Sequence, residues 1–405
     1  MNKTILNDLA VFGGSPAFPE PLHVGRPNAC HRERFLKRVN DLLDRRWLTN
    51  QGPFVTEFEQ RVAEFLGVRH CVAMCNGTTA LEIAIRAAGL SGEVIVPAFT
   101  FISTAHALKW QGVTPVFCDV DPRTHHIDPS RLEGLITERT TGVIGVHLWG
   151  RPCAVEALEE ITRKRRLKLL FDAAHAFGNS HQGRRIGSFG DAEVFSFHAT
   201  KFFHTLEGGA VVTNDDGLAR VLRLMHNMGF SGYDQVVCAG TNAKMNEISA
   251  AMGLTMFESL EAILAINQRH YRHYERELSE IPGLQLMRYD EGERNNYQYI
   301  VLDIDEPKAG ISRDQLVVIL HKENVLARRY FYPGCHQMEP YRSDPFYGGL
   351  HLPVTDHLAG RLLILPTGEA LQPDQVTGIC RIIRWVMDHA PEIAQRLSKN
   401  TEGGK

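Results

Sequence analysis

The stretches KLLFDAAHAFG (residues 168–178) and AEVFSFHATK (residues 192–201) each contain an apolar run that is followed by a charged residue, Asp172 in the first and Lys201 in the second. Continuous runs of aliphatic and aromatic residues are typical of strands that are buried on both faces of a parallel sheet. Asp172 and Lys201 fall where these strands end. Because ligands bind at the carboxyl ends of the strands in open parallel sheets, the sequence predicts a binding site that contains both side chains.

Further apolar runs of the same kind follow one another along the chain from residue 72 to about residue 214. They are EVIVPAFTF (93–101), TPVFCDVD (114–121), GVIGVHLWG (142–150) and AVVTND (210–215). Stretches with helical periodicity separate these runs, which favours a mostly parallel sheet with helices on both faces. We therefore predict an α/β fold for this part of the chain.

The pattern changes after a helical stretch at residues 245–273. Two strand-like runs, LQLMRY (284–289) and NNYQYIVLDID (295–305), precede the helical RDQLVVILHKENV (313–325). An order of strand, strand and helix is typical of a small α+β unit. Since 405 residues are more than one hydrophobic core usually covers, we predict a large domain at 1–270, which includes an N-terminal arm, and a small domain at 271–405.

The charge balance argues against nucleic acids and membranes as partners. The chain has 44 Lys and Arg against 47 Asp and Glu, a formal net charge of −3, which leaves no electrostatic footprint for either. No uninterrupted apolar stretch approaches membrane-spanning length, and no signal-like segment follows Met1. The 8 cysteines are scattered, without a CxxC pair; Cys71 and Cys75 are four residues apart, but no second Cys or His pair stands nearby at zinc-finger spacing. We expect reduced thiols, no bound metal, a cytoplasmic location and small-molecule substrates.

The stretch CNGTTALEIAIRAAGL (75–90) opens with a pattern that suits a phosphate. Gly77, Thr78 and Thr79 precede an apolar helical periodicity. Free backbone N–H groups, hydroxyl donors and the positive end of the helix dipole all favour an anion at such a helix start. The same residues also make an ordinary helix cap, so this stretch alone leaves both interpretations open.

The polar residues after the two opening strands have two interpretations each. Asp172 needs a partner that offsets its desolvation, either a pyridinium nitrogen or the start of a helix. His175 contacts the same ligand or is a core histidine. Lys201, flanked by Ser196, Thr200 and small or apolar residues, is a solvated lysine or an amine that forms a Schiff base in a partly desolvated site.

The order of these motifs resembles the DegT/DnrJ/EryC1/StrS family of sugar-nucleotide aminotransferases. Nine stretches match in chain order between about Trp47 and Leu371. They are LTNQGPFVTEFEQRVAEFLGV, CNGTTAL, VIVPAFTFISTAHAL, PVFCDVDPRTHHIDP, VHLWGRP, FDAAHAFG, FSFHATK, EGGAVVT and GTNAKMNEISAAMGL. The resemblance implies the fold type I of pyridoxal-phosphate aminotransferases, with a large, mostly parallel, seven-stranded sheet domain and a smaller C-terminal α+β domain.

The resemblance also implies which residues bind the cofactor, pyridoxal 5'-phosphate. Lys201 holds it as a Schiff base, Asp172 pairs with its pyridine nitrogen, and Phe101 stacks on its ring. The remaining contacts are those of Gly77, Thr78 and Ser196 with the phosphate and of His175 with the phenolic oxygen.

A shared active site follows from the same resemblance. Asn242 matches an asparagine that reaches the phosphate site of a neighbouring subunit, which implies a homodimer. Ala243 and Lys244 stand where the family commonly has Tyr and Arg, so the local subunit contacts differ from the family pattern.

Three segments resemble most the branch of the family that makes dTDP-4-amino-4,6-dideoxy-D-glucose from the 4-keto-6-deoxy sugar nucleotide. They are LAVFGGSPAFPEPLHVGRPN (9–28), HLWGRPC (147–153) and YFYPGCHQMEPYR (330–342). The resemblance implies a transaminase with two half-reactions, in which L-glutamate gives its amino group and a ketosugar receives it. By position alone, we expect substrate contacts from Arg329, Tyr330 and His336.

Several alternative functions remain open from the sequence. Within the family, the main alternative is a 3-aminotransferase or an enzyme of a GDP-linked ketosugar. A dehydratase has histidine in place of the Schiff-base lysine; Lys201 argues against it, although His204 is a candidate second base. A non-catalytic binding protein on the same fold is disfavoured, because such a protein would not need Lys201, Asp172 and Ser196, which are all present. A nicotinamide dehydrogenase is disfavoured because no GxGxxG follows a strand.

Overall fold

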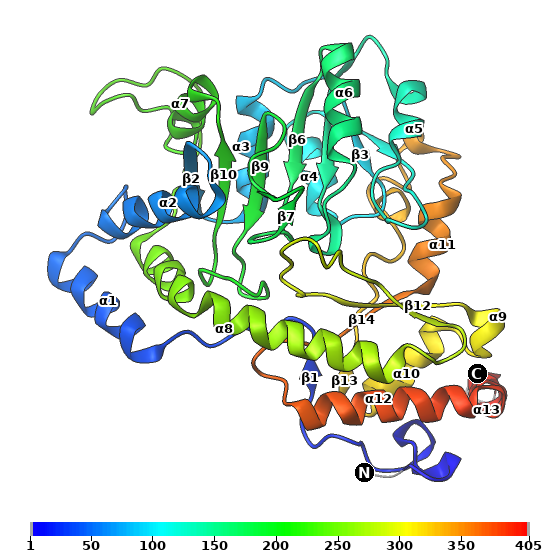
Figure 1. Cartoon of the computed structure of the whole chain (residues 1–405). Helices are drawn as coiled ribbons and strands as arrows, with labels where there is room; N and C mark the ends of the chain where they lie inside the picture. The colour runs from blue at the N-terminus through cyan, green and yellow to red at the C-terminus, as the bar shows by residue number, and fades with distance from the viewer. Residues whose placement is uncertain (1–2, 403–405) are drawn as a thin grey trace.

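The computed structural model describes residues 3–402 and has a central sheet of seven strands (Figure 1). The strands lie in the order β2 (His70–Met74), β10 (Gly209–Thr213), β9 (Ala192–Ser196), β6 (Lys168–Asp172), β5 (Thr140–Val146), β3 (Glu93–Pro97) and β4 (Thr114–Cys118). Strand β10 is antiparallel to both of its neighbours, and every other pair in this sheet is parallel. The predicted α/β class with a mostly parallel, seven-stranded sheet is confirmed.

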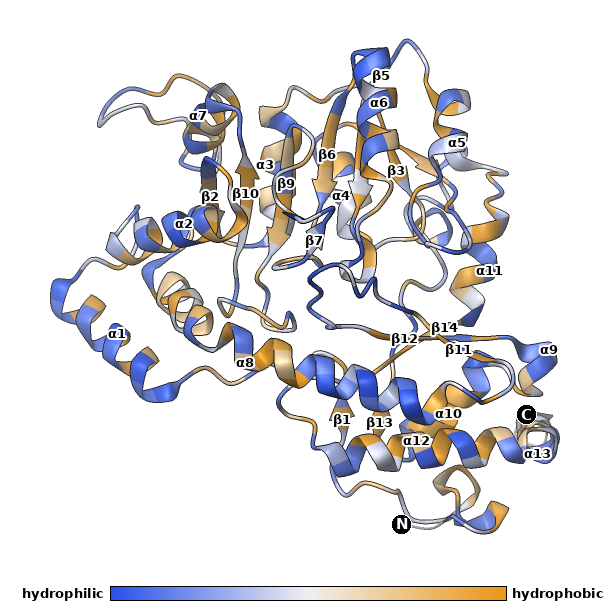
Figure 2. Cartoon of the chain, viewed as in Figure 1, coloured by the Kyte–Doolittle hydropathy of each residue, from blue (hydrophilic) through white to orange (hydrophobic). Residues whose placement is uncertain are grey.

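Helices cover both faces of the sheet because successive strand residues point to opposite faces. In β6, Leu169 and Phe171 belong to one apolar cluster, and Leu170 belongs to another. The helices of the first cluster are α2 (Pro53–Leu66), α5 (Pro129–Leu132), α6 (Val155–Arg165), the first part of α8 (Glu247–Leu278) and, through Leu42, α1 (Arg32–Arg45); those of the second are α3 (Gly77–Ala87), α4 (Ser103–Trp110) and α7 (Asp216–Met225). In Figure 2 the central strands are mostly hydrophobic, whereas helix α1, which lies apart from the sheet, is mostly hydrophilic.

The C-terminal part of the chain forms a second, smaller group of elements below the central sheet in Figure 1. Its antiparallel sheet has the order β11 (Leu284–Leu286), β12 (Ile300–Ile304) and β14 (Leu362–Leu365). Its helices are α9 (Glu306–Ala309), α10 (Arg313–Lys322), α11 (Pro353–Arg361), α12 (Pro373–Asp388) and α13 (Ala390–Glu402). A further hairpin, β7 (Ser180–His181) with β8 (Arg184–Arg185), belongs to the loop between β6 and β9.

Helix α8 runs without interruption through residue 270, where we expected a domain boundary. It is long and apolar enough to cross a membrane, but 61% of its most apolar window is buried within the protein. The helix packs on α2 at one end and on α12 at the other. Helix α8 therefore packs against both groups of elements and connects them.

The N-terminal segment packs against the C-terminal group of elements. Leu9, Phe18 and Leu22 share one apolar cluster with residues of β12, β14 and α12. Strand β1 (Leu22–His23) pairs parallel with β13 (Val325–Leu326). The chain then passes from β1 toward the central sheet, where Gly25 packs against Thr200, so the segment before β1 belongs to the C-terminal group and only the stretch after β1 reaches the sheet.

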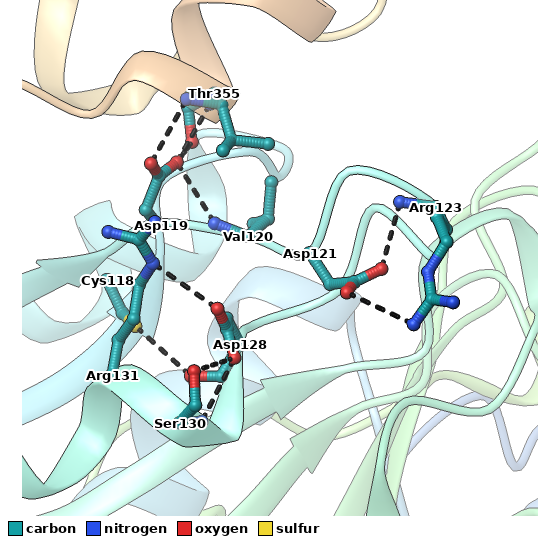
Figure 3. Close-up of polar contacts among 10 residues, drawn as sticks. Cys118, Asp119, Val120, Asp121, Arg123, Asp128, Ser130, Arg131 and Thr355 are labelled. Atoms are coloured by element: carbon teal, nitrogen blue, oxygen red, sulfur yellow. Dashed lines mark hydrogen bonds and ion pairs between the residues drawn. The ribbon is translucent and has the colours of Figure 1, made fainter.

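A buried aspartate also joins the two groups of elements (Figure 3). Asp119 directly follows β4, and its carboxylate accepts hydrogen bonds from the backbone N–H and the hydroxyl of Thr355, both at 2.8 Å. A third hydrogen bond, of 3.1 Å, comes from the backbone N–H of Val354. Because these donors lie at the start of α11, the carboxylate caps this helix and fixes it against the sheet.

Candidate active site

A cavity of about 720 Å³ lies at the carboxyl ends of the central strands, where the C-terminal elements and the N-terminal arm meet the sheet. Most of the residues expected at the site line this one cavity. They are Gly77, Thr78, Phe101, Asp172, His175, Ser196, Lys201 and Tyr330. The parallel topology explains this convergence, because β3, β6 and β9 end at the same edge of the sheet.

Lys201 lies in a turn five residues after β9 ends at Ser196, and its surroundings favour a neutral amine. Burial lowers the pKa of Lys201 to about 8, although nearby Asp172 acts in the opposite direction. The Nζ atom lies 3.4 Å from the hydroxyl of Tyr299. A lysine with this pKa has a substantial neutral fraction near physiological pH, as covalent bonding to a carbonyl requires. A fully solvated lysine does not fit these surroundings.

Asp172 is a buried carboxylate with neutral donors around it. It is the last residue of β6, and its side chain accepts hydrogen bonds from the hydroxyl of Thr104 at 2.8 Å and from the backbone N–H of Ala174 at 3.1 Å. No helix begins after Asp172, because the next residues form turns, so the helix-cap interpretation does not apply. Among the residues the structure describes, Asp172 forms no ion pair, and its charge is available to a cation in the cavity.

The start of helix α3 has the features of a phosphate site and of a helix cap at once. Asn76 is the N-cap, and its side chain accepts a 2.8 Å hydrogen bond from the backbone N–H of Thr79. Gly77 lies directly against β9, since a Cβ atom there would be only 2.9 Å from the Cβ atom of Ser196. Glycine thus allows the first helical N–H groups and the Ser196 hydroxyl to converge on one point.

An aromatic wall closes another side of the cavity. Phe101 is 53% exposed although it is a large apolar residue, and its ring meets the edge of Phe331 at 6.3 Å. Phe331 in turn stacks on Trp149 at 5.2 Å and on Tyr330 at 5.1 Å. An exposed phenyl ring at the mouth of a cavity suits a planar ligand.

His175 is buried in a way that fixes its protonation. Burial, together with the charge of Lys201, lowers its pKa well below the ordinary value, so the imidazole is neutral. Its Nδ1 atom accepts a 3.3 Å hydrogen bond from the backbone N–H of Trp149. The proton of the neutral ring is therefore on Nε2, which can donate a hydrogen bond to a ligand oxygen.

Two of the three residues that we expected to contact substrate do not line the cavity. Arg329 donates a 3.1 Å hydrogen bond to Asp314 on helix α10, whereas its neighbours Arg328 and Tyr330 line the cavity. Alternation along an extended chain explains the difference, because successive side chains point to opposite sides. His336 is buried, with its Nε2 atom 3.0 Å from Asp356 at the start of α11.

Two other residues singled out in the sequence also lie away from the cavity. His204, the candidate second base, is buried, and its Nε2 atom lies 2.9 Å from the carbonyl oxygen of Asn28. Asn242 is exposed and accepts a 2.7 Å hydrogen bond from Lys244. It therefore contributes nothing to the cavity of its own chain.

The cavity residues that come from the N-terminal arm, from α8 and from the C-terminal elements were not predicted from the sequence. They are Val24, Gly25, Arg26, Asn28, Asn267, Gln298, Tyr299, Arg328, Thr367 and Gly368. None of these residues follows a strand of the central sheet. The pairing of β1 with β13 brings the arm to the site. The only local sign of this in the sequence is a glycine and an arginine, Gly25 and Arg26, directly after a short apolar run.

Comparisons with known proteins place the chain in one class. The sequence profile of the DegT/DnrJ/EryC1/StrS aminotransferase family matches residues 29–384, and the chain belongs to this family. The dTDP-4-amino-4,6-dideoxy-D-glucose transaminase of Shigella dysenteriae is 35% identical over 369 residues, which cover 90% of this chain and 99% of that relative. The GDP-perosamine synthase of Caulobacter vibrioides is 36% identical over 315 residues, which cover 75% and 82% of the two chains.

A solved structure agrees with this family membership. The crystal structure of DesI in the presence of its TDP-sugar product matches with a TM-score of 0.93 and 47% identity, and the match covers 97% of this chain and 100% of that one. The predicted fold type I architecture and the aminotransferase class are confirmed. The protein is a sugar-nucleotide aminotransferase of a family that depends on pyridoxal phosphate.

The cavity fits that cofactor on the evidence of its own residues. It contains an amine with a lowered pKa and a buried carboxylate without a charged partner. It also contains a glycine that keeps the start of α3 open, and an exposed phenyl ring. These features suit, in turn, an aldehyde, a pyridinium nitrogen, a phosphate and an aromatic ring.

Proposed function

We propose that the protein transfers the amino group of L-glutamate to C4 of dTDP-4-keto-6-deoxy-D-glucose and so makes dTDP-4-amino-4,6-dideoxy-D-glucose for deoxyaminosugar biosynthesis. The observation that carries this proposal is the Lys201 amine, with its pKa lowered to about 8, in a cavity that also holds a buried aspartate. The name of the Shigella dysenteriae relative and the TDP-sugar in the DesI structure support the choice of substrate.

The cofactor contacts in this proposal are divided among the loops that follow the central strands. Lys201 bonds to the cofactor aldehyde, and Asp172 faces the pyridine nitrogen. The others are Gly77, Thr78 and Ser196 for the phosphate, Phe101 for the ring and His175 for the phenolic oxygen. When bound, pyridoxal phosphate supplies an electron sink for the carbon that loses its proton.

Lys201 is also the residue that moves the proton. Its Nζ atom would be released when the amine of the donor takes its place on the cofactor, and it would then remove the proton from Cα of L-glutamate in the first half-reaction and deliver a proton to C4 of the sugar in the second. An amine with a pKa of about 8 suits both directions near neutral pH, because it gains and loses a proton at similar cost. The Tyr299 hydroxyl, 3.4 Å from Nζ, holds the amine in place. Asp172 supplies the negative charge that stabilises a protonated pyridine ring.

We infer that the working form is a cytoplasmic homodimer with shared active sites. Asn242 lies outside its own cavity and is exposed, as a residue that serves a partner requires. The segment at 227–242 also exposes large apolar side chains, namely Met228, Phe230, Tyr233, Val236 and Val237. An apolar surface of this kind suits a second copy of the chain.

All 8 cysteines are free thiols, which supports a reducing compartment, as the proposed cytoplasmic location requires.

The direct test is an assay of the purified protein with dTDP-4-keto-6-deoxy-D-glucose and L-glutamate, followed by NMR of the product. Protonation from one face gives an equatorial amine, so H4 should show large couplings to both H3 and H5. An amine at C3, or no product from this substrate, contradicts the proposal. A GDP-linked ketosugar is the second candidate, because the GDP-perosamine synthase is as similar in sequence as the first relative. The same assay with the GDP-linked sugar decides between them.

A further inference from the structure

Two arginines, Arg26 and Arg328, line the active-site cavity without a carboxylate partner. Neither guanidinium forms an ion pair or a hydrogen bond with a carboxylate within residues 3–402. The Arg328 guanidinium lies over the ring of Tyr330, 5.5 Å from the ring centre. The adjacent Arg329, by contrast, is paired with Asp314 outside the cavity. Both arginines are exposed, so an anionic ligand in the cavity can reach them.

Strand pairing brings these two arginines to one place. Strands β1 and β13 run parallel, with Leu22 opposite Val325 and His23 opposite Leu326. Arg26 and Arg328 follow the ends of these two strands, so both side chains leave the same end of the pair. The turn between β1 and Arg26 is tight against the catalytic loop, since a Cβ atom on Gly25 would lie 3.1 Å from the Cβ atom of Thr200. Arg26 therefore directly follows a residue that packs against Thr200, the neighbour of Lys201, whereas Arg328 lies over Tyr330 in the same cavity.

The carboxylates of the cavity do not neutralise this pair of cations. The acidic residues that line the cavity are Asp172 and Glu207. Asp172 lies at the end of β6 with Thr104 as its partner, and Glu207 lies 3.5 Å from His198. Two guanidinium groups that enter one cavity from neighbouring strands favour an anionic ligand between them.

We infer that Arg26 and Arg328 bind the two carboxylates of the amino donor. This inference rests on the proposed function, because it concerns the donor of the same reaction. One carboxylate of the donor is attached to the carbon that exchanges its proton with Lys201, so it must be held close to the lysine. The diphosphate of the sugar nucleotide is separated from C4 by the sugar ring. A carboxylate therefore fits the position of the arginines better, and the second carboxylate distinguishes a dicarboxylic amino acid from a monocarboxylic one.

The test compares Arg26→Met and Arg328→Met with the wild type in the first half-reaction alone. The loss of a charge-assisted hydrogen bond should lower kcat/KM for L-glutamate by about 10- to 100-fold. The preference for L-glutamate over L-alanine should fall as well, because alanine has only one carboxylate. Arg328→Lys keeps the charge without the planar fork and should restore part of the loss. Arg123→Met is the matched control, since Arg123 is 89% exposed on the loop after β4 (Figure 3).

Binding of unreactive ligands gives a readout that does not depend on turnover. Calorimetry should show weaker binding of glutarate, an unreactive dicarboxylate, in both methionine variants and unchanged binding of dTDP. Weaker binding of dTDP with unchanged glutarate binding overturns the inference in favour of a diphosphate site. Variants that sediment as a smaller species than the control also overturn it, because the arginines then belong to a subunit interface.

The same measurements separate this inference from the proposed function. If the wild type does not aminate the ketosugar with L-glutamate, but glutarate binding depends on both arginines, the proposed function fails and the arginine assignment stands. If the wild type turns over normally and both variants behave like Arg123→Met, only the arginine assignment fails.

Discussion

The active-site cavity has two sides that differ in origin and in chemistry. The sheet side consists of the residues after the central strands, with Lys201, Asp172 and Gly77 as its main groups. The arm side consists of residues 24–26, 28, 298–299, 328, 330–331 and 367–368. In the proposed function the sheet side binds the cofactor and so serves every substrate alike, whereas the arm side adds aromatic and cationic side chains. We therefore expect changes on the sheet side to affect all substrates equally, and changes on the arm side to separate them.

The largest effect is expected from Lys201→Ala. Because the proposed function gives Lys201 Nζ both the bond to the cofactor and the transfer of the proton, both half-reactions should slow by about 10³-fold or more. The visible absorbance that borohydride abolishes in the wild type should be absent. Lys164→Ala, an exposed lysine of α6, is the control. A variant at position 201 that still forms a reducible adduct and turns over normally shows that the assignment is wrong.

Asp172→Asn should have the next largest effect. Asparagine keeps the shape of the side chain and one acceptor oxygen for the Thr104 hydroxyl, so the protein should fold and bind some cofactor. Loss of the negative charge should lower both half-reactions by about 10²- to 10³-fold. Stopped-flow spectra with each substrate measure the two rates. Near wild-type turnover means that Asp172 has only a structural role.

Gly77→Ala tests the phosphate site on the same side. The added Cβ atom would lie 2.9 Å from Ser196, so the start of α3 must move and cofactor affinity should fall by about 10- to 100-fold. Gly360→Ala is the matched control, because no atom lies within 4 Å of its added Cβ. Equal affinities in the two variants, measured by titration of the cofactor-free protein, exclude the phosphate role of this helix start.

The lowered pKa of Lys201 also has a consequence for stability. Burial lowers it to about 8, with Asp172 opposing, from an ordinary value of 10.5. Between these values the unfolded chain binds more protons than the folded one, so the stability of the cofactor-free protein rises with pH across this window. At pH 7 the buried ammonium lowers the free energy of unfolding of the cofactor-free protein by on the order of 1–3 kcal/mol.

Lys201→Met should therefore make the cofactor-free protein more stable at pH 7, and this advantage should shrink toward pH 10.5. Urea titrations of both proteins at the two pH values measure the difference, with Lys164→Met as the control. An advantage that is equal at both pH values shows that the gain comes from the methionine side chain and not from the charge.

The smallest effect is expected on the arm side, from Tyr330→Ala. Its ring stacks on Phe331 at 5.1 Å and lines the cavity, so its removal should raise the KM for the ketosugar by about 10-fold. Cofactor affinity should remain unchanged, unlike in Gly77→Ala. A loss of cofactor affinity equal to that of Gly77→Ala removes the distinction between the two sides.

The difference between the sides also explains what could be predicted from the sequence. Asp172 and Lys201 each follow an apolar run, and the convergence of parallel strand ends is a local rule that the sequence displays. The arm side depends on the pairing of β1 with β13, which joins Leu22 to Val325. Periodicity within a short window carries no information about such a pairing. For the same reason the sequence predicts a substrate contact from Arg329, whereas Arg328 is the arginine that lines the cavity. The direction of each side chain depends on the register of a strand only two residues long.

The pairing of β1 with β13 has a further consequence during protein synthesis. Residues 22–23 leave the ribosome early, but their partner strand at 325–326 is made only near the end of translation. The central sheet, which is complete by residue 213, can form while the arm has no place to bind. Until then Leu9, Phe18 and Leu22 lack the C-terminal residues that cover them in the folded protein. A nascent chain of this protein therefore carries an apolar end that chaperones can recognise until the last third of the chain has been made.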